Sequence, residues 1–369
     1  MRNQFIHSVI AFFCWWMLLL PFDYALFDPF IKVLQAPFYW LLTLIDDSLV
    51  FESDTYGMFT LFAFALLLGI NSEKLVGYIL RKRNLESKNV LQLVLGGILF
   101  FFLVKYGWDK VVKMQFYLPE PNTVYTPFGQ LSKDIAFWSV TGSSYSYNVF
   151  LGISELLVAL LLLFNRTRFF GSILSIVTFT QIVWINFSFD ISVKGLAFTL
   201  LLASLLLSLS YFEKWKQLFG FPTTIPIESS KHTIPRFVKW IFVLLILIEC
   251  LYPTFKSGNF NDDSAKRPLH HGAYEIIGNP TFKKVFIHRR GYIILQSNND
   301  QFIDFKAIQT KNGNWRIAVS NKQIDIQLNW TEGKSEIVIN SSNFKLKSLP
   351  YRSLPLLKND VHIFSDSFH

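Results

Sequence analysis

The sequence has only two cysteines, Cys14 and Cys250, and both lie in apolar runs without a CxxC motif. It therefore encodes neither a disulfide framework nor a dithiol relay. Charged side chains are also scarce, because Asp, Glu, Lys and Arg make up 17% of the 369 residues while hydrophobic residues make up 51%. A soluble domain of this length would carry more charge. These shortages argue against thiol redox chemistry and indicate a membrane protein.

The motifs of several common activities are missing as well. The sequence has no nucleophile elbow for Ser/His/Asp catalysis and no glycine-rich loop that could cradle a phosphate. Histidines occur in the C-terminal third without the HxxxH or HExxH spacing of a metal site, at His270, His271, His288, His362 and His369. We therefore expect no metal site.

The distribution of positive charge points to a membrane rather than to nucleic acid. The net charge is +9, but the basic residues cluster in short loops beside apolar runs, as in the cytoplasmic loops of membrane proteins. We expect no nucleic-acid partner and place the densest cluster, between Lys74 and Lys88, in the cytoplasm. Arg166 and Arg168 form another basic turn, which we expect to bind lipid headgroups.

Apolar runs predict about seven helical spans. They are His7–Leu20, Tyr56–Ile70, Val90–Trp108, Val149–Phe164, a run after Arg168, a run ending near Tyr211, and Phe237–Leu251. No cleavage site follows the first run, so we expect it to remain as a span. Phe27–Val50 is amphipathic and is expected to lie in the outer interface, although its entry into the bilayer is an alternative. All basic loops then fall on one side, with the N-terminus in the cytoplasm and the C-terminus outside.

From Tyr252 onward, short segments of alternating polar and apolar residues replace the long apolar runs. They are separated about every ten residues by turn sequences such as Lys311-Asn312-Gly313-Asn314. This pattern predicts an antiparallel β-sandwich or small barrel. We expect residues 254–369 to form a separate domain on the outer face. The loop Val111–Tyr147 is also expected to be a structured outer segment.

One carboxylate, Glu155, lies about two helical turns inside the apolar run Val149–Phe164. A charge in the hydrocarbon costs roughly 2.5–3.5 kcal/mol on insertion scales, so such residues usually face the bundle interior and have a partner. Two readings stay open for Glu155. It is either a proton-carrying or ligand-binding acid, or a structural partner of Lys110, Lys194 or an amide.

Asn186, Asp190 and Lys194 join Glu155 in a predicted outer polar pocket, to which the family resemblance described below adds Tyr106 and Lys110; by position alone, these two are ordinary interface residues at the end of a span. Asp190 and Lys194 are one helical turn apart and form either a lining of this pocket or a solvated ion pair. Asn186 either caps the sixth span or donates into the pocket. Asp54 or Thr55 is expected to cap the second span.

The segments Tyr106–Phe116, Gly152–Leu157, Leu161–Arg168 and Asn186–Lys194 together resemble the larger bacterial members of the DoxX-like family. The resemblance implies a membrane all-α bundle with a DoxX-like four-helix core, extra N-terminal spans and a C-terminal extracytoplasmic domain. On this basis the chain divides into N-terminal spans (1–89), the core (90–211), a linker with the last span (212–253) and the β domain (254–369). It also implies a bacterial inner-membrane location.

The family is linked to membrane redox complexes, so the resemblance implies an accessory or ligand-binding subunit of a quinone-linked redox system. Its partners would then be the lipid bilayer and a membrane redox protein, and a quinone-like molecule would bind in the polar pocket. Two other functional classes stay open from the residues. One is a small-molecule or lipid transporter, and the other is a structural or assembly protein that presents the β domain. Whether the chain is an enzyme is left open.

Overall fold

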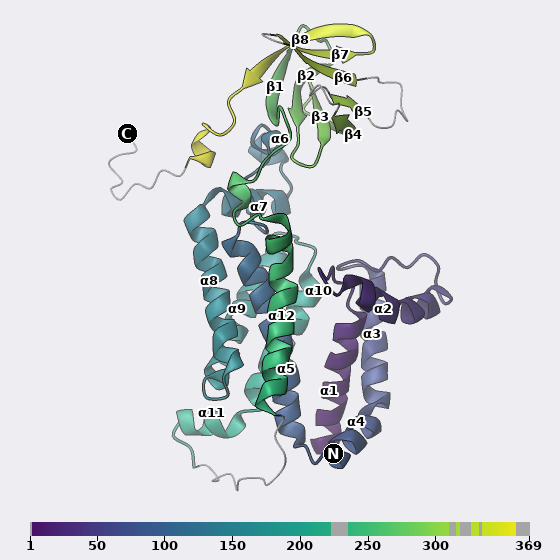
Figure 1. Cartoon of the computed structure of the whole chain (residues 1–369), viewed down its shortest axis with the longest axis vertical. Helices are drawn as coiled ribbons and strands as arrows, with labels where there is room; N and C mark the ends of the chain where they lie inside the picture. Colours follow the sequence, from purple (N-terminus) through teal and green to yellow (C-terminus); the bar gives the residue numbers. More distant parts are fainter. Residues whose placement is uncertain (1, 223–234, 310–314, 318–325, 332–333, 359–369) are drawn as a thin grey trace. The chain divides into compact units, whose positions relative to one another are not determined.

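The computed structural model describes residues 2–222, 235–309, 315–317, 326–331 and 334–358. These residues form two compact units (Figure 1). The helical unit comprises Met1–Gln115 and Val149–Phe260, and the barrel unit comprises Phe116–Asn148 and Asn261–His369. The segment between the third and fourth predicted spans therefore belongs to the same unit as the β-strands, a grouping that the sequence did not predict.

The helical unit contains long apolar helices joined by short turns. Its helices are α1 (Arg2–Leu19), α2 (Asp28–Thr43), α3 (Tyr56–Asn71), α4 (Glu73–Lys82), α5 (Ser87–Val111), α8 (Tyr145–Leu163), α9 (Arg168–Ser188), α10 (Lys194–Leu209), α11 (Phe212–Leu218) and α12 (Arg236–Ser257). In the described residues, α5, α8, α9 and α12 are each long and apolar enough to cross a membrane. The number rises to six if each of the bent pairs α3/α4 and α10/α11 is one span.

All seven predicted spans thus correspond to helices, but α1 is too short to count as a candidate span. The sharp bends explain the difference in counting, because α3 meets α4 at 51° and α10 meets α11 at 70°. The coarse prediction of an apolar helical region is confirmed, and the count of seven spans stays a prediction.

Helix α2 lies across the C-terminal end of α1 (Figure 1). The side-chain amide of Gln35 donates hydrogen bonds to the carbonyls of Leu18 and Leu20, both at 2.9 Å, and thereby satisfies acceptors that the helix end leaves open. The rest of α2 exposes large apolar side chains, among them Phe30 and Trp40. The predicted amphipathic segment is therefore a helix, and its place in the interface stays a prediction.

The barrel unit contains a closed antiparallel barrel in which each strand pairs with its neighbour in sequence and β1 pairs with β8. The strands are β1 (Gly272–Ile277), β2 (Phe282–Ile287), β3 (Tyr292–Ser297), β4 (Phe302–Gln309), β5 (Trp315–Ile317), β6 (Ile326–Thr331), β7 (Lys334–Ile339) and β8 (Ser342–Leu349). Apolar side chains such as Val285, Ile293 and Leu328 are fully buried and fill the interior. The predicted antiparallel domain is confirmed, and of its two forms the structure shows the barrel.

The segment 116–148 contributes short helices to the barrel unit: α6 (Pro121–Val124) and α7 (Lys133–Ser143). Tyr125 lies against Phe286 of β2, with the ring centroids 6.2 Å apart. Phe286 is fully buried although β2 turns it away from the main interior cluster. The segment thus covers an apolar patch on the outer side of the barrel wall.

Candidate functional site

Glu155 on α8 forms a buried ion pair with Lys110 at the end of α5. The Lys110 ammonium lies 2.9 Å from one oxygen of the Glu155 carboxylate and 3.0 Å from the other. Only 8% of each side chain is exposed. Of the partners that the sequence left open for Glu155, the structure selects Lys110.

Two glycines allow α5 and α8 to come close enough for this pair. A methyl group on Gly152 would lie 2.5 Å from the carbonyl oxygen of Gly107, which is inside van der Waals contact. A methyl group on Gly107 would lie 3.0 Å from the carbonyl oxygen of Gly152. Small residues commonly allow such close packing of membrane helices. Gly107 lies one helical turn before Lys110 on α5, and Gly152 lies one helical turn before Glu155 on α8. The close approach of the two helices therefore occurs beside the ion pair.

More polar groups of α5 surround the pair. The Lys110 ammonium lies 5.8 Å from the centroid of the Tyr106 ring, within the usual range of a cation–π contact. Lys105 and Asp109 form a second ion pair along the helix. Tyr106, Lys110 and Glu155 are therefore brought together, and Lys105 and Asp109, which were not predicted as site residues, form the second pair on the same helix.

The other three predicted residues lie at the turn between α9 and α10. The Lys194 ammonium pairs with Asp190 at 2.8 Å, and 83% of the Asp190 side chain is exposed. Of the two alternatives for Asp190 and Lys194, the structure therefore shows the solvated ion pair. The Asn186 amide donates to the carbonyl of Val193 at 3.4 Å. Asn186 thus fastens the turn and does not cap the sixth span, and a common pocket for all six residues stays a prediction.

The cap of α10 comes instead from Asp54, a residue distant in sequence. Its carboxylate accepts hydrogen bonds from the backbone N–H groups of Lys194 at 2.7 Å and Gly195 at 2.8 Å. A negative charge at a helix N-terminus satisfies free donors and complements the helix dipole. Thr55 caps α3 by accepting from the N–H of Met58. Of the two caps proposed for the second span, Thr55 is confirmed, while Asp54 stabilises the sixth.

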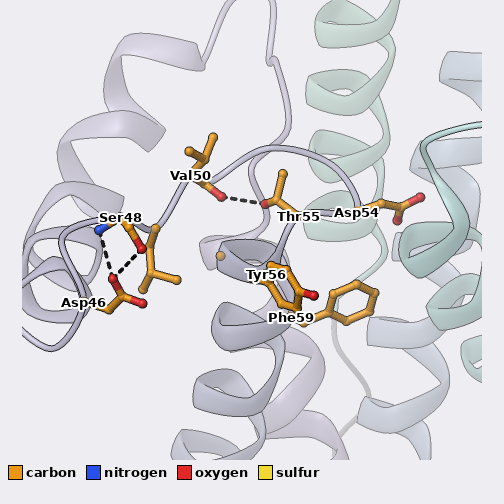
Figure 2. A pocket seen from close by; sticks show the side chains of 9 residues that line it. Asp46, Ser48, Val50, Asp54, Thr55, Tyr56 and Phe59 are labelled. Carbon is orange, nitrogen blue, oxygen red and sulfur yellow. Dashed lines mark hydrogen bonds between the residues drawn. The ribbon is translucent and has the colours of Figure 1, made fainter.

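A pocket of about 690 Å³ adjoins Asp54 on the loop before α3 (Figure 2). Figure 2 shows Asp46 and Ser48 bonded to each other, with Asp54 further along the loop. The Asp46 carboxylate accepts from the N–H of Ser48 at 2.9 Å and from its hydroxyl at 2.6 Å. Both acids of the pocket therefore already accept hydrogen bonds from the protein itself.

A second buried carboxylate, Glu249 on α12, was not selected from the sequence. One of its oxygens accepts from the N–H of Ala25, and the other accepts from the N–H groups of Leu26 and Phe27, both at 3.0 Å. These amides lie at the entry to α2, so Glu249 ties the last long helix to the N-terminal helices. Its three donors all belong to the backbone, which indicates an architectural role.

Arg168 is also placed differently from its prediction. Its guanidinium is buried and donates to the carbonyls of Leu162 at 2.8 Å and Leu163 at 3.3 Å. It therefore caps the C-terminus of α8, where free carbonyls attract a cation, and its burial argues against the predicted contact with lipid headgroups. Arg166 in the same turn is exposed, and its lipid contact stays a prediction.

Within the described residues, no group of three or more His, Cys, Asp or Glu side chains could hold a metal ion. His362 and His369 lie outside the described residues. The two cysteines do not pair, since Cys14 and Cys250 are both free.

Comparisons with known proteins provide one relative of unknown activity. The chain is 36% identical over 111 residues to the uncharacterized protein YwoB of Bacillus subtilis, a match that covers 29% of this chain and 68% of the relative. No family model matches the sequence. No solved structure matches it significantly.

Proposed function

The chain belongs to the family of the Bacillus subtilis protein YwoB, and we propose that it is a membrane protein that binds a small amphipathic molecule at the Lys110–Glu155 pair. The buried ion pair between α5 and α8 carries this proposal. An ionisable residue inside an apolar helix raises the free energy of membrane insertion, and such residues usually mark a site for a ligand, an ion or a proton. The YwoB relationship itself assigns no activity.

The chemistry of the pair favours a head group that combines hydrogen-bond acceptors with donors. An ammonium offers donors only, and an ionised carboxylate offers acceptors only. Lys110 can therefore donate to a carbonyl oxygen, while Glu155 can accept from a hydroxyl. An isoprenoid quinone presents carbonyls when oxidised and hydroxyls when reduced, so the pair complements both forms.

The surroundings suit the apolar part of such a molecule. Tyr106 stacks on Phe102 with the ring centroids 6.1 Å apart, and Trp108 follows on the same helix. Ligand sites are usually lined by apolar and aromatic groups with a few polar groups that fix orientation. This supports an accessory subunit of a quinone-linked membrane redox system, with a redox protein and the bilayer as partners.

The orientation belongs to the same proposal. In the helical unit, basic residues follow α4 and lie in the α8–α9 turn and on α11, which Figure 1 places at one end of the bundle together with the N-terminus. By the positive-inside rule we place this end in the bacterial cytoplasm. Helix α12 then leaves the membrane on the outer side, and the barrel follows as an extracytoplasmic domain.

Ligand-induced stabilisation tests the proposed site. A ligand that binds only the folded protein raises the free energy of unfolding by about 2.7 kcal/mol when present at about 100 times its Kd. We expect a short-chain quinone to raise the unfolding temperature of the detergent-solubilised protein. The same quinone should leave the unfolding temperature of the double variant K110M/E155L unchanged. An analogue with the same tail and a dimethylbenzene head is the matched control. Equal shifts with both compounds, or an undiminished shift in the double variant, would refute a quinone site here.

A further inference from the structure

The barrel unit contains a buried carboxylate that the proposed function does not use. Glu120 stands directly before α6, and 4% of its side chain is exposed. One carboxylate oxygen shares a hydrogen bond of 3.0 Å with the His271 ring and accepts from the backbone N–H of Arg289 at 3.1 Å. His271 directly precedes β1, and Arg289 lies in the turn between β2 and β3. A single side chain of the 116–148 segment thus connects to two separate parts of the barrel.

Further charged groups pack around this carboxylate. The His288 ring lies 3.9 Å from the same Glu120 oxygen, and the Arg289 guanidinium lies 3.9 Å from the other. That guanidinium is held by two hydrogen bonds to Asp262, at 2.6 and 2.9 Å. The same guanidinium lies over the ring of Tyr117, 4.3 Å from the centroid. Glu120 therefore sits in a recess formed by two imidazole rings and a guanidinium, and the hydrogen bonds to Asp262 hold the guanidinium in place.

The same segment is fastened at two more points, neither of which depends on charge. The hydroxyl of Tyr351 donates to the carbonyl of Pro119 at 2.5 Å, and the hydroxyl of Tyr125 donates to the carbonyl of Pro350. Between them, the Tyr125 ring covers Phe286. Release of the segment would expose Phe286 to solvent, so the hydrogen bonds of Glu120 help to keep this apolar side chain covered.

We propose that Glu120, with His271 and His288, forms an acid-sensitive clasp that fastens the 116–148 segment to the barrel. Loss of charge on Glu120 or gain of charge on His288 changes the charge balance of a site in which this carboxylate faces two imidazole rings and the guanidinium of Arg289. The titratable and charged groups that surround it are His271, His288, Arg289, Arg290, Tyr351, Asp262, Arg267 and Arg352.

The directions of two pKa shifts agree with this proposal. Burial lowers the pKa of His288 from its ordinary value of 6.5, and the nearby Glu120 carboxylate only partly opposes that shift. Burial alone would raise the pKa of Glu120, but the hydrogen bond from His271 and the charges of His288 and His271 bring it below 4.5. The folded state binds fewer protons than the released state in both cases, so acid weakens the clasp. The weakening begins below the ordinary His value and continues below the ordinary Glu value.

The clasp has a consequence through the chain itself. The 116–148 segment joins α5 to α8, the helices that carry Lys110 and Glu155. If the proposed function is correct, acid outside the membrane would loosen the connection between the two halves of the ligand site. The clasp can be tested without any ligand, so its failure and the failure of the ligand site are separate results.

Hydrogen exchange of the full-length protein in detergent provides the test. Amide exchange is measured by mass spectrometry at about pH 7.5 and about pH 4.5, and corrected for the intrinsic rates. Because the folded clasp binds fewer protons than the released segment, we expect corrected exchange in peptides covering 117–127 to rise severalfold in acid. Peptides from β3 should stay protected. Unchanged exchange in 117–127, or an equal rise in β3, would overturn the clasp.

Variants assign the effect to the cluster. E120Q removes the charge while keeping the size, and we expect fast exchange of 117–127 already at neutral pH. H288Q should move the acid transition to lower pH, because only Glu120 then drives it. E275Q alters an exposed carboxylate on β1 and is the control that should match the parent. If E120Q does not fold, the pH profiles of the parent and H288Q decide, and a transition that H288Q leaves unchanged contradicts the proposal.

Discussion

Replacing the two members of the Lys110–Glu155 pair separately and together distinguishes a ligand site from a structural ion pair. E155L leaves the Lys110 ammonium without the carboxylate that now lies 2.9 Å away. Removing one partner of a buried pair costs about 3–5 kcal/mol, whereas replacing both by apolar residues of similar size is often neutral or stabilising. We therefore expect E155L to lose about 3–5 kcal/mol of unfolding free energy. K110M/E155L should recover most of it.

The assay combines unfolding with ligand binding. Unfolding in a graded mixture of mild and denaturing detergents, followed by circular dichroism, gives the free energies of the parent, K110M, E155L and the double variant. E155Q keeps the size of the side chain but removes its charge, so we expect it to abolish quinone binding and to lower the free energy of unfolding, and E155A should lower that free energy further through the lost packing. The double variant separates the two roles, because it should be stable and still fail to bind a quinone.

The neighbouring pair on α5 provides a matched control. K105M/D109L removes two charges from the same helix without changing Lys110 or Glu155, and it should keep the quinone-induced stabilisation. If E155L stays within about 0.5 kcal/mol of the parent, the pair is not desolvated as the structure places it. If K110M/E155L binds the quinone like the parent, the pair is only structural.

Three further substitutions test the packing that positions this pair. G152A should lower the free energy of unfolding by about 1–3 kcal/mol and weaken quinone binding, because the new methyl group would press on the Gly107 carbonyl. G97A is the control, since no atom lies within 4 Å of the added methyl group. It should leave quinone binding unchanged, and the free energy of unfolding should stay the same or rise by about 0.5–1 kcal/mol. D54A should lower the free energy of unfolding by about 1 kcal/mol through loss of the α10 cap, and equal stability in thermal unfolding would contradict that role. E249Q should lower the free energy of unfolding by about 1.5–3 kcal/mol, since an amide cannot accept all three backbone hydrogen bonds as an ionised carboxylate does. An unfolding curve like that of the parent would show that these hydrogen bonds are not formed.

The parts of the fold that were predictable from sequence depend on local patterns. Alternating segments separated by turn residues led to an antiparallel β domain, and Val285 and Ile287 of β2 do lie in the barrel interior. Long apolar runs led to helices for the same reason, since hydrophobic periodicity is a local signal. The bends at Ser72 and Tyr211 were less visible, because no proline or glycine stands at either break.

The candidate site was predictable to the extent that charge inside an apolar run demands a partner. This rule selected Glu155, and Lys110 was among the three kinds of partner left open. It did not decide between them, because sequence spacing does not tell which helices touch. The glycines at positions 107 and 152 were the available signal, since small residues permit close helix packing.

Residues that bind backbone amides far away in sequence were missed. Glu249 and Ala25 are 224 positions apart, and Asp54 and Lys194 are 140 apart. A carboxylate that accepts from amides has no charged partner to search for, so charge patterning cannot find it. Arg168 was misread for a related reason, because its acceptors are carbonyls at a helix end.

Mass spectrometry of the molecules that co-purify with the detergent-extracted protein tests the ligand site most directly. The parent and K110M/E155L would be purified in parallel from the same host and their organic extracts compared. We expect an isoprenoid quinone or a molecule of that type in the parent at near-stoichiometric amounts, and its loss from the double variant. Identical extracts from the two proteins would contradict a ligand site at the pair between α5 and α8.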